Sequence, residues 1–479
     1  MIGSRFSHRR TKIICTIGPA TASAAVIEQL IRAGMDIARF NLSHGKFSEH
    51  ARSIRLVRHL GKRLQTNMAV LIDLPGPKYR IGQLKNGQVI LKKGARLRLT
   101  TRHIEGDATR LPVNLPNLAQ DVRSGDTVLL ADGALELRVE AVDGAEVTCR
   151  VIVGGQLIPG RGLVVPGMRT SGPFLTDSLR KSLLFAARQH PDYLAVSFVT
   201  GAQDIIDVRG VLSDSRTNIP IIAKIERGQA VTHFNEILSA TDGVMVARGD
   251  LGVDIPLKRI PLVQKEIIRK CNLAGKPVIV ATEMLESMVR SARPTRAETT
   301  DVANAIFDGA DATMLSAETS IGKYPVAAVR MMAEIARETE NKLPYETLLV
   351  RRGNHLEPRT EELISYDACH TAHRLKAVAI IAYTRSGNTA TRVSKYRPKV
   401  PILALTPSNT VCGRLSLYWG VHPLKMAGIS SVATLFTAGA NLARDLGLGR
   451  AGDLVVITGG IPLGEKGSTN LLKVETIRA

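Results

Sequence analysis

The chain has 479 residues, which is long enough for about two or three domains with substantial cores. With 44% hydrophobic and 22% charged residues it has the composition of an ordinary globular protein, and no apolar run approaches the roughly 20 residues of a membrane span. The net charge of +21 is unusual and could indicate nucleic-acid binding, but only 4% of residues are aromatic and the basic residues are spread out. Attraction of anionic small substrates, or a bias of the lineage, explains the charge at least as well, and we expect no nucleic acid and no membrane as partners.

The five cysteines are scattered along the chain and form no CxxC pair. This pattern argues against a disulfide framework or a zinc site and favours a reducing, cytoplasmic location. No apolar signal region follows the basic start of the chain, which agrees with that expectation.

From residue 11 onward, short apolar runs alternate with segments of helical spacing. A helix is expected over 24–33, ended by Gly34, and another over 48–64. The predicted strands are 12–17, 37–41, 68–73, 193–198, one beginning at 221, 244–247, 277–282 and 312–316. Eight strand–helix units over roughly 250 residues predict an α/β fold with a closed (β/α)₈ TIM barrel. We assign residues 1–78 and 168–347 to it.

The third unit is interrupted between residues 79 and 167. The helical period disappears there, and short alternating runs follow one another between turns that contain Gly and Asp. We interpret this segment as an inserted all-β domain, resembling a small β-barrel, on the active face of the larger barrel. Such a lid could close over a substrate and exclude water.

Residues 348–479 start a new pattern. A helix over 361–375 and strands over 378–384, 401–407 and 453–460 predict a three-layer α/β domain with a parallel sheet. Directly after its first strand, hydroxyls and a glycine lead into a helix, at residues 384–389. This turn could hold a phosphate, or its hydroxyls could simply cap the helix.

The stretch from 221 to 254 organises the chain chemically. One predicted strand leads into Lys224 and Glu226, and the next leads into Arg248, Gly249 and Asp250, with a segment of helical spacing between them. Two carboxylates beside a cation suit a divalent metal and a phosphate, although surface ion pairs would look the same.

Other polar residues are expected at the same rim, since parallel strands bring their C-terminal ends together. The remaining rim residues are Arg39, Asn41, Ser43, His44, Asp73, Ser197, Phe198, Thr282, Glu283, Ser316 and Glu318. Such a ring suits phosphoryl transfer or metal-stabilised enolate chemistry.

Long motifs on this framework resemble those of pyruvate kinase. They are TKIICTIGPAT (11–21), MDIARFNLSHG (35–45), AKIE (223–226), MVARGDLG (245–252), ATEMLESM (281–288), PTRAE (294–298) and DVANAIFDGADATMLSAET (301–319). The resemblance covers nearly the whole chain. It implies transfer of a phosphoryl group from phosphoenolpyruvate to ADP, giving pyruvate and ATP, with Mg²⁺ or Mn²⁺ as cofactor. It also implies a homotetramer with a regulatory C-terminal domain.

The resemblance also implies roles for individual residues. Lys224 would stabilise the phosphoryl group, Glu226 and Asp250 would hold the metal ion, and Arg39 would contact the phosphate. The backbone of Gly249 and Asp250 would bind the substrate carboxylate, and Thr282 would lie beside the enolate carbon, with Ser316 and Glu318 relaying a proton through water. The expected nucleotide-binding residues are Arg80, Arg161, Asn41 and His44. A phosphorylated effector would bind Thr384, Ser386, Gly387, Asn388 and Thr389, with residues 466–470 as a closing loop.

One departure from the family pattern concerns the monovalent cation. Many members have glutamate where this chain has Lys78, and they require K⁺. An ammonium there could supply the charge that K⁺ otherwise provides, so we expect this enzyme not to need K⁺. Four residues remain from the monovalent site: Asn41, Ser43, Asp73 and Leu74. Glu283 in place of glutamine and Thr200 in place of arginine have no explanation in the sequence.

Two other functions would fit part of the sequence. A phosphoenolpyruvate- or pyruvate-dependent enolate lyase on the same barrel would share the metal chemistry, but it leaves the inserted and C-terminal domains unexplained. A nucleic-acid-binding protein would account for the charge of +21 but not for the carboxylate-rich rim.

Overall fold

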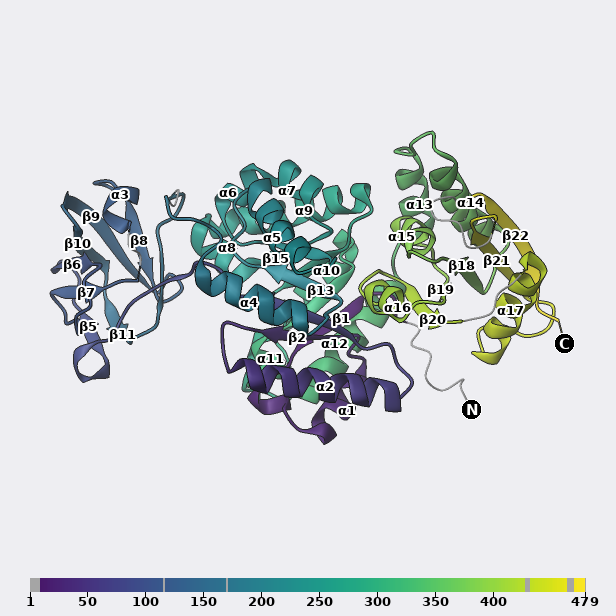
Figure 1. The fold of residues 1–479 in the computed structure, drawn as a ribbon, viewed down its shortest axis with the longest axis horizontal. Coiled ribbons are helices and arrows are strands. Elements are labelled where there is room, and N and C mark those ends of the chain that lie inside the picture. The colour runs from purple at the N-terminus through teal and green to yellow at the C-terminus, as the bar shows by residue number, and fades with distance from the viewer. Residues whose placement is uncertain (1–8, 115–116, 169–170, 427–430, 463–468, 479) are drawn as a thin grey trace.

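The computed structural model describes residues 9–114, 117–168, 171–426, 431–462 and 469–478. Three bodies lie in a row in Figure 1: the inserted β domain on the left, the barrel in the centre and the C-terminal domain on the right. Within the described ranges, no helix is both long enough and apolar enough to cross a membrane.

The central body is a closed parallel barrel with strand order β1-β17-β16-β15-β14-β13-β3-β2. The strands are β1 (Lys12–Thr16), β2 (Ile37–Asn41), β3 (Ala69–Leu74), β13 (Tyr193–Val196), β14 (Ile221–Ile225), β15 (Gly243–Ala247), β16 (Val278–Ala281) and β17 (Ala312–Leu315). Apart from Asn41 their residues are all buried, as continuous apolar runs in a parallel sheet should be. The predicted TIM barrel is confirmed, with strand ends within two residues of the expected ones.

The barrel is surrounded by helices, most of which follow the expected periodicity. They are α1 (Ala24–Ala33), α2 (Phe47–Arg63), α4 (Asp177–Arg188), α5 (Ala202–Asp214), α6 (Gly228–Thr232), α7 (Phe234–Ala240), α8 (Arg248–Asp254), α9 (Ile260–Ala274), α10 (Arg296–Asp308), α11 (Ala317–Ser320) and α12 (Pro325–Asn341). The segment between β14 and β15, expected as one helix, is divided at His233. The backbone there leaves the helical range, and His233 Nδ1 lies 3.0 Å from the carbonyl of Thr200.

The inserted domain is all-β, as predicted. Its strands are β4 (Tyr79–Arg80), β5 (Val89–Leu91), β6 (Arg96–Thr100), β7 (Arg110–Pro112), β8 (Thr127–Leu130), β9 (Leu135–Asp143), β10 (Glu146–Val153), β11 (Gly155–Leu157) and β12 (Gly162–Val164), with one short helix, α3 (Leu118–Asp121). Seven of them form a sheet in the order β4-β12-β8-β9-β10-β6-β7, and a bridge between Ile81 and Val113 joins its two edges. The sheet therefore curls around its own apolar core.

The C-terminal domain has a sheet with helices on both faces. Its helices are α13 (Tyr345–Gly353), α14 (Thr360–Arg374), α15 (Asn388–Lys395), α16 (Asn409–Leu415) and α17 (Val432–Asp445). The sheet order is β20-β19-β18-β21-β22, formed by β18 (Ala379–Tyr383), β19 (Ile402–Thr406), β20 (Val421–Lys425), β21 (Leu454–Gly459) and β22 (Leu471–Thr476). Separate apolar clusters lie on its two faces, which confirms the three-layer architecture.

Two edge strands of this sheet escaped the sequence prediction. β20 contains Pro423, which is tolerated because an edge strand leaves one row of backbone groups unpaired. β22 pairs antiparallel with β21, so the sheet is not purely parallel as expected. Its half-exposed pattern lacks the continuous apolar run that revealed the other strands.

The C-terminal domain is seated in the floor of the barrel. Leu417, just after α16, is fully buried among the residues that fill the barrel interior, such as Met245. The hydroxyl of Tyr193 donates to the carbonyl of Arg414 at 2.5 Å, and Trp419, which is 2% exposed, lies against Tyr345 of α13. Residues distant in sequence thus complete the barrel core.

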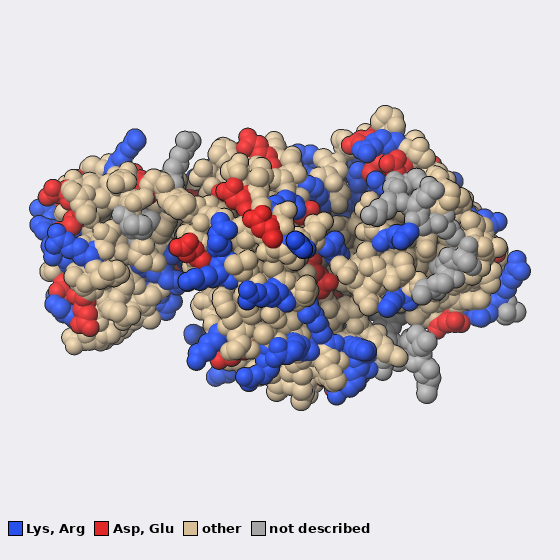
Figure 2. Space-filling view, in the orientation of Figure 1, with Lys and Arg blue, Asp and Glu red and all other residues tan. Residues whose placement is uncertain are grey.

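Charge is distributed unevenly over this framework. In the view of Figure 2, lysine and arginine side chains cover much of the face below the barrel, where α1 and α2 lie in Figure 1. On α2, the exposed side chains of Arg52, Arg55 and Lys62 form no ion pair with any residue that the structure describes. Part of the charge excess is therefore an uncompensated basic surface outside the rim.

Protonation of Asp192, which lies beneath the C-terminal domain, should make the stability of the fold depend on pH. Burial raises the pKa of Asp192 to about 6, against about 3.9 in an unfolded chain. The folded protein binds this proton more tightly, so the stability that this group contributes is lost as the pH rises from about 4 to 6. We expect Asp192→Asn to gain about 1–2 kcal/mol relative to the parent over that range, a discounted value because the residue partly reaches solvent. Thermal unfolding of both proteins at pH 4.5 and 7 checks this, and a constant difference would contradict it.

Candidate active site

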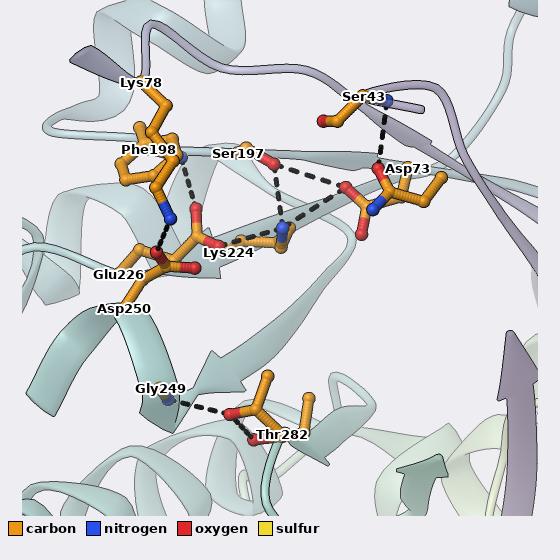
Figure 3. A network of polar contacts seen from close by, with 12 residues as sticks. Ser43, Asp73, Lys78, Ser197, Phe198, Lys224, Glu226, Gly249, Asp250 and Thr282 are labelled. Carbon is orange, nitrogen blue, oxygen red and sulfur yellow. Dashed lines mark hydrogen bonds and ion pairs between the residues drawn. The ribbon is translucent and has the colours of Figure 1, made fainter. Parts of the chain in front are cut away.

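Lys224 lies at the centre of a buried polar network at the end of β14 (Figure 3). Its ammonium is 2.9 Å from Glu226 Oε1, 2.8 Å from Ser197 Oγ and 3.3 Å from Asp73 Oδ1. Burial disfavours its charge, but Asp73 and Glu226 outweigh burial and raise the pKa of Lys224. Lys224, of which 7% is exposed to solvent, is therefore held as a cation.

The two candidate metal ligands come from neighbouring strands. Glu226 follows β14 and is 1% exposed, and its Oε2 accepts the backbone N–H of Phe198 at 2.7 Å. Burial raises the pKa of Glu226; Lys224 opposes this effect and the nearby Asp250 adds to it. Asp250 lies in the first turn of α8, and its Oδ1 accepts a hydrogen bond from the ammonium of Lys78 at 2.7 Å. The two carboxylates thus face one another closely enough to interact.

This donor set fits a hard divalent cation with few protein ligands. Within the described part of the chain, no cluster of three or more His, Cys, Asp or Glu side chains could hold a metal. Two carboxylates on one rim are nevertheless what Mg²⁺ uses when substrate oxygens and water complete its six ligands. Glu226 and Asp250 are carboxylates of this kind, and a metal ion would take the place of the contacts that Lys224 and Lys78 make with them.

Arg39 and Asp73 form a second ion pair beside Lys224. The guanidinium of Arg39 contacts Asp73 Oδ2 through Nε at 2.8 Å and Nη2 at 2.7 Å, and its Nη1 donates to Thr16 Oγ1 at 2.8 Å. Burial acts against the charge on Asp73, but Lys224 and Arg39 lower its pKa overall. Asp73 therefore carries a negative charge shared between two cations.

Thr282, at the end of β16, has an unusual backbone. Its φ is 69°, and that of the next residue, Glu283, is 54°. Residues other than glycine rarely adopt this left-handed region, and β-branched residues such as threonine do so least of all. Thr282 Oγ1 accepts the backbone N–H of Gly249 at 2.8 Å and donates to the carbonyl of Ala281 at 2.6 Å. The hydroxyl is thus fixed at the start of α8, next to Asp250.

Ser316 and Glu318 follow β17, and the structure gives them different surroundings. Glu318 is fully buried, with Oε2 accepting the N–H of Ser316 at 2.7 Å and Oε1 that of Leu285 at 3.0 Å. Both carboxylate oxygens therefore tie two rim loops together. Ser316 Oγ is buried and makes no hydrogen bond to a described residue.

The candidate nucleotide residues lie where the lid meets the barrel. Arg80 in β4 pairs in register with Gly162, next to the exposed Arg161. His44 is exposed, and its pKa is lowered by partial burial and by the positive charges of Arg80, Arg39 and Lys78. Arg80 and Arg161 therefore form a positive region beside His44 that can attract phosphates.

The residues of the presumed monovalent site are brought together only in part. Asn41 Oδ1 accepts the N–H of Ser43 at 3.1 Å, and the oxygens of Asp73 are occupied by the cations described above. Leu74 is buried and its carbonyl accepts from Ser197 Oγ at 2.9 Å. Lys78 points instead to Asp250 and, at 3.7 Å, to Asp132 of the lid.

The expected effector turn follows β18. Gly387 has φ 100°, and its N–H donates to Thr384 Oγ1 at 2.9 Å, immediately before α15 begins at Asn388. Thr389 Oγ1 lies 2.9 Å from Thr469 Oγ1, so the end of the proposed closing loop adjoins the turn. Residues 466–468 of that loop lie outside the described residues. Ser386 lies within the turn.

A cavity of about 580 Å³ opens between the lid and the barrel, beside this rim. It is lined by Lys78 and Phe198, together with lid residues such as Asn114, but by neither candidate metal ligand. Glu226 and Asp250 line a smaller cavity, which Lys78 and Phe198 also border. These two side chains therefore separate the carboxylates from the larger space.

Sequence reasoning missed what two of these residues do. Arg248 was read only as a charge at a strand tip, yet its guanidinium turns to the neighbouring loop and pairs with Asp301 at 2.6 Å. Thr16 was not singled out, although it orients Arg39. Thr16 ends a rim strand as a polar residue, a signal that could have found it; nothing local predicts the direction of Arg248.

Comparisons with known proteins agree with this geometry. The family model described as pyruvate kinase, barrel domain, matches residues 8–329, and that for the pyruvate kinase alpha/beta domain matches residues 362–475. The chain is 45% identical over 472 residues to a pyruvate kinase of Geobacillus stearothermophilus, covering 98% of this chain and 80% of the relative. It is 41% identical to one of Clostridium acetobutylicum, covering 98% and 100%. A crystal structure of a pyruvate kinase from Cryptosporidium parvum superposes with a TM-score of 0.93 at 35% identity, covering 98% and 96%. These matches favour the kinase over the enolate lyase.

Proposed function

The chain belongs to the pyruvate kinase family and transfers the phosphoryl group of phosphoenolpyruvate to ADP in the last step of glycolysis, and we propose that the rim network around Lys224 performs this transfer. The observation that carries the proposal is the buried ammonium of Lys224, 2.9 Å from Glu226, whose carboxylate also interacts with Asp250 on the neighbouring rim loop. It joins a cation for the migrating group to two carboxylates for a metal ion.

In the transfer, the bond between the phosphorus and the enol oxygen breaks while a new bond forms to the terminal phosphate oxygen of ADP. The ammonium of Lys224 and the guanidinium of Arg39 stabilise the charge on the moving group. Glu226 and Asp250 would hold Mg²⁺ or Mn²⁺, which supplies charge neutralisation when bound. The backbone N–H of Asp250, at the start of α8, suits the substrate carboxylate, and the N–H of Gly249 would have to leave Thr282 Oγ1 to join it.

The enolate that remains must take up a proton on carbon to become pyruvate. Thr282 is the hydroxyl that we place beside this carbon, because it is fixed to the backbone of Gly249. The buried hydroxyl of Ser316 supports a role in supplying the proton through water. Glu318 then acts by holding the loops, since both of its oxygens accept backbone N–H groups.

The nucleotide would lie across the junction of lid and barrel. Arg80 and Arg161 supply positive charge to its phosphates, with His44 and Asn41 at the edge of the site. Lys78 links Asp250 of the barrel to Asp132 of the lid, which supports lid closure over the bound substrates.

Regulation and assembly are also proposed. The turn from Thr384 to Thr389 suits a phosphorylated effector, with the backbone of Gly387 and Asn388 at the start of α15 and Ser386 among its hydroxyls. We further propose a homotetramer in the cytoplasm. Five free, buried cysteines support a reducing compartment, and a single-chain mass in sedimentation equilibrium would contradict the tetramer.

We expect activity without K⁺, because the ammonium of Lys78 lies 2.7 Å from Asp250 Oδ1 and supplies a fixed positive charge there. In tetramethylammonium buffer the enzyme should keep its kcat within about 3-fold, whereas Lys78→Glu should lose at least about 10-fold and regain it with K⁺. The assay couples pyruvate formation to lactate dehydrogenase, with ADP omitted as the control for a lyase. Collapse of the parent activity that K⁺ restores would contradict the proposal. Phosphorylated metabolites added in the same assay test the effector.

A further inference from the structure

Arg248 joins the two loops that carry the proposed carboxylate-binding and proton-transfer groups. It is the first residue of α8 and immediately precedes Gly249 and Asp250. Its side chain is 10% exposed and leaves its own loop for the one that follows β16. Nη2 donates to the carbonyl of Thr282 at 2.8 Å and to that of Glu283 at 3.3 Å. One guanidinium therefore fixes two successive peptide groups.

These two peptide groups belong to Thr282 and Glu283, the two residues with positive φ that follow β16. A non-glycine residue held at positive φ costs of order 1 kcal/mol or more, and persists only where its surroundings impose it. Successive carbonyls point the same way in a helical conformation of either hand, so a single donor can hold both. Releasing that donor would let Thr282 relax toward negative φ and would move its hydroxyl away from Gly249.

Asp301, in α10, holds the guanidinium in place. Its Oδ2 lies 2.6 Å from Arg248 Nη1, and its side chain is 36% exposed. The aspartate therefore sits at the outer end of the arginine, while Nη2 reaches inward to the loop. The order Asp301, Arg248, Thr282 forms a chain of contacts from a surface helix to the rim.

We propose that Arg248 and Asp301 are positioning residues that hold Thr282 at the substrate carbon and lock its loop to that of Gly249. The proposal rests on the proposed role of Thr282. The contacts of Arg248 described above are with Asp301 and with the loop after β16, so loss of either residue should affect proton transfer to the enolate more than binding of ADP.

The test compares Arg248→Lys and Asp301→Asn with Thr282→Ala, each assayed for kcat, for the KM of both substrates and for exchange of the pyruvate methyl protons with D₂O by NMR. We expect Arg248→Lys to lower kcat and methyl exchange about 10–100-fold with the KM for ADP within about 2-fold. Asp301→Asn should show a smaller effect in the same direction, because the carbonyl contacts remain.

A matched control is Arg209→Lys. Arg209 also pairs with an aspartate, Asp242, at 2.7 Å and donates to a backbone carbonyl, that of Ala240, but at the N-terminal ends of the strands. It should shift the thermal midpoint about as much as Arg248→Lys while leaving kcat unchanged. An equal decrease in kcat in both arginine variants would show that Arg248 has only a general structural role.

The double variant Arg248→Lys/Thr282→Ala separates the inference from its premise. If Arg248 acts through Thr282, adding Arg248→Lys to Thr282→Ala should lower kcat by less than 2-fold further. A full additional loss would overturn the positioning role. If Thr282→Ala alone leaves kcat and methyl exchange unchanged, the proposed role of Thr282 fails first, and the inference falls with it.

Discussion

Replacing Lys224 by methionine is expected to lower kcat by at least about 10²–10³-fold, the range found when a preorganised electrostatic group is removed. The ammonium lies between Asp73 and Glu226, whose charges raise its pKa, so it is fully protonated at neutral pH. Methionine fills a similar volume but leaves the two carboxylates without their shared cation. The assay measures pyruvate formation at saturating phosphoenolpyruvate, ADP and Mg²⁺.

The matched control is Lys12→Met, at the opposite end of the barrel. Lys12 begins β1, is 3% exposed and donates to the carbonyl of Val421 at 2.6 Å. Burial lowers the pKa of Lys12 to about 8, so the charged form of this lysine is also disfavoured by its surroundings. We expect Lys12→Met to change the thermal midpoint but not kcat. Turnover of Lys224→Met within about 10-fold of the parent would show that its role is misassigned.

The sequence was sufficient to place the rim because parallel strands all end at the same face of a barrel. Lys224, Glu226 and Asp250 each follow a short apolar run, and the alternation of runs and helices identified those runs as barrel strands. Their convergence then followed from topology alone. This explains why the grouping of these residues at the rim could be predicted without any information on side-chain directions.

Side-chain directions decide the rest of the site, and they depend on partners far away in the chain. Lys78 contacts Asp250 across 172 positions, because the lid strand that follows it brings the segment back over the rim. Arg248 precedes Asp250 in sequence but points to another loop, toward Asp301. Spacing along a strand cannot distinguish these two outcomes.

Glu318 makes structural contacts that the sequence does not predict. The resemblance implies that it relays a proton with Ser316, and in the structure its two oxygens accept the N–H groups of Ser316 and Leu285. A buried carboxylate whose two oxygens each accept a backbone N–H ties two rim loops together. Only the folded arrangement of both loops reveals these contacts.

The way in which the C-terminal domain packs against the barrel could not be predicted from the sequence either. Leu417 lies in an apolar run that reads as ordinary domain core, yet it fills the interior of the barrel. α16 carries it there, and the effector turn touches the same helix, since a methyl group at Gly387 would lie 3.4 Å from Leu415 Cδ2. The close packing of α16 on the barrel floor therefore makes a second substitution informative.

Replacing Gly413 by alanine is expected to destabilise the protein by about 3–5 kcal/mol. A methyl group there would lie 1.9 Å from Asp192 Oδ1, and Asp192 cannot turn away without losing the N–H of Val70, which donates to its Oδ2 at 2.8 Å. α16 must then lift from the barrel, which adds partial loss of the Leu417 packing to the overpacking cost. The matched control, Gly210→Ala in α5, has nothing within 4 Å of the new methyl group and should gain up to about 1 kcal/mol. Thermal unfolding of both variants decides the matter: if Gly413→Ala is as stable as Gly210→Ala, the helix does not pack on Asp192 as described.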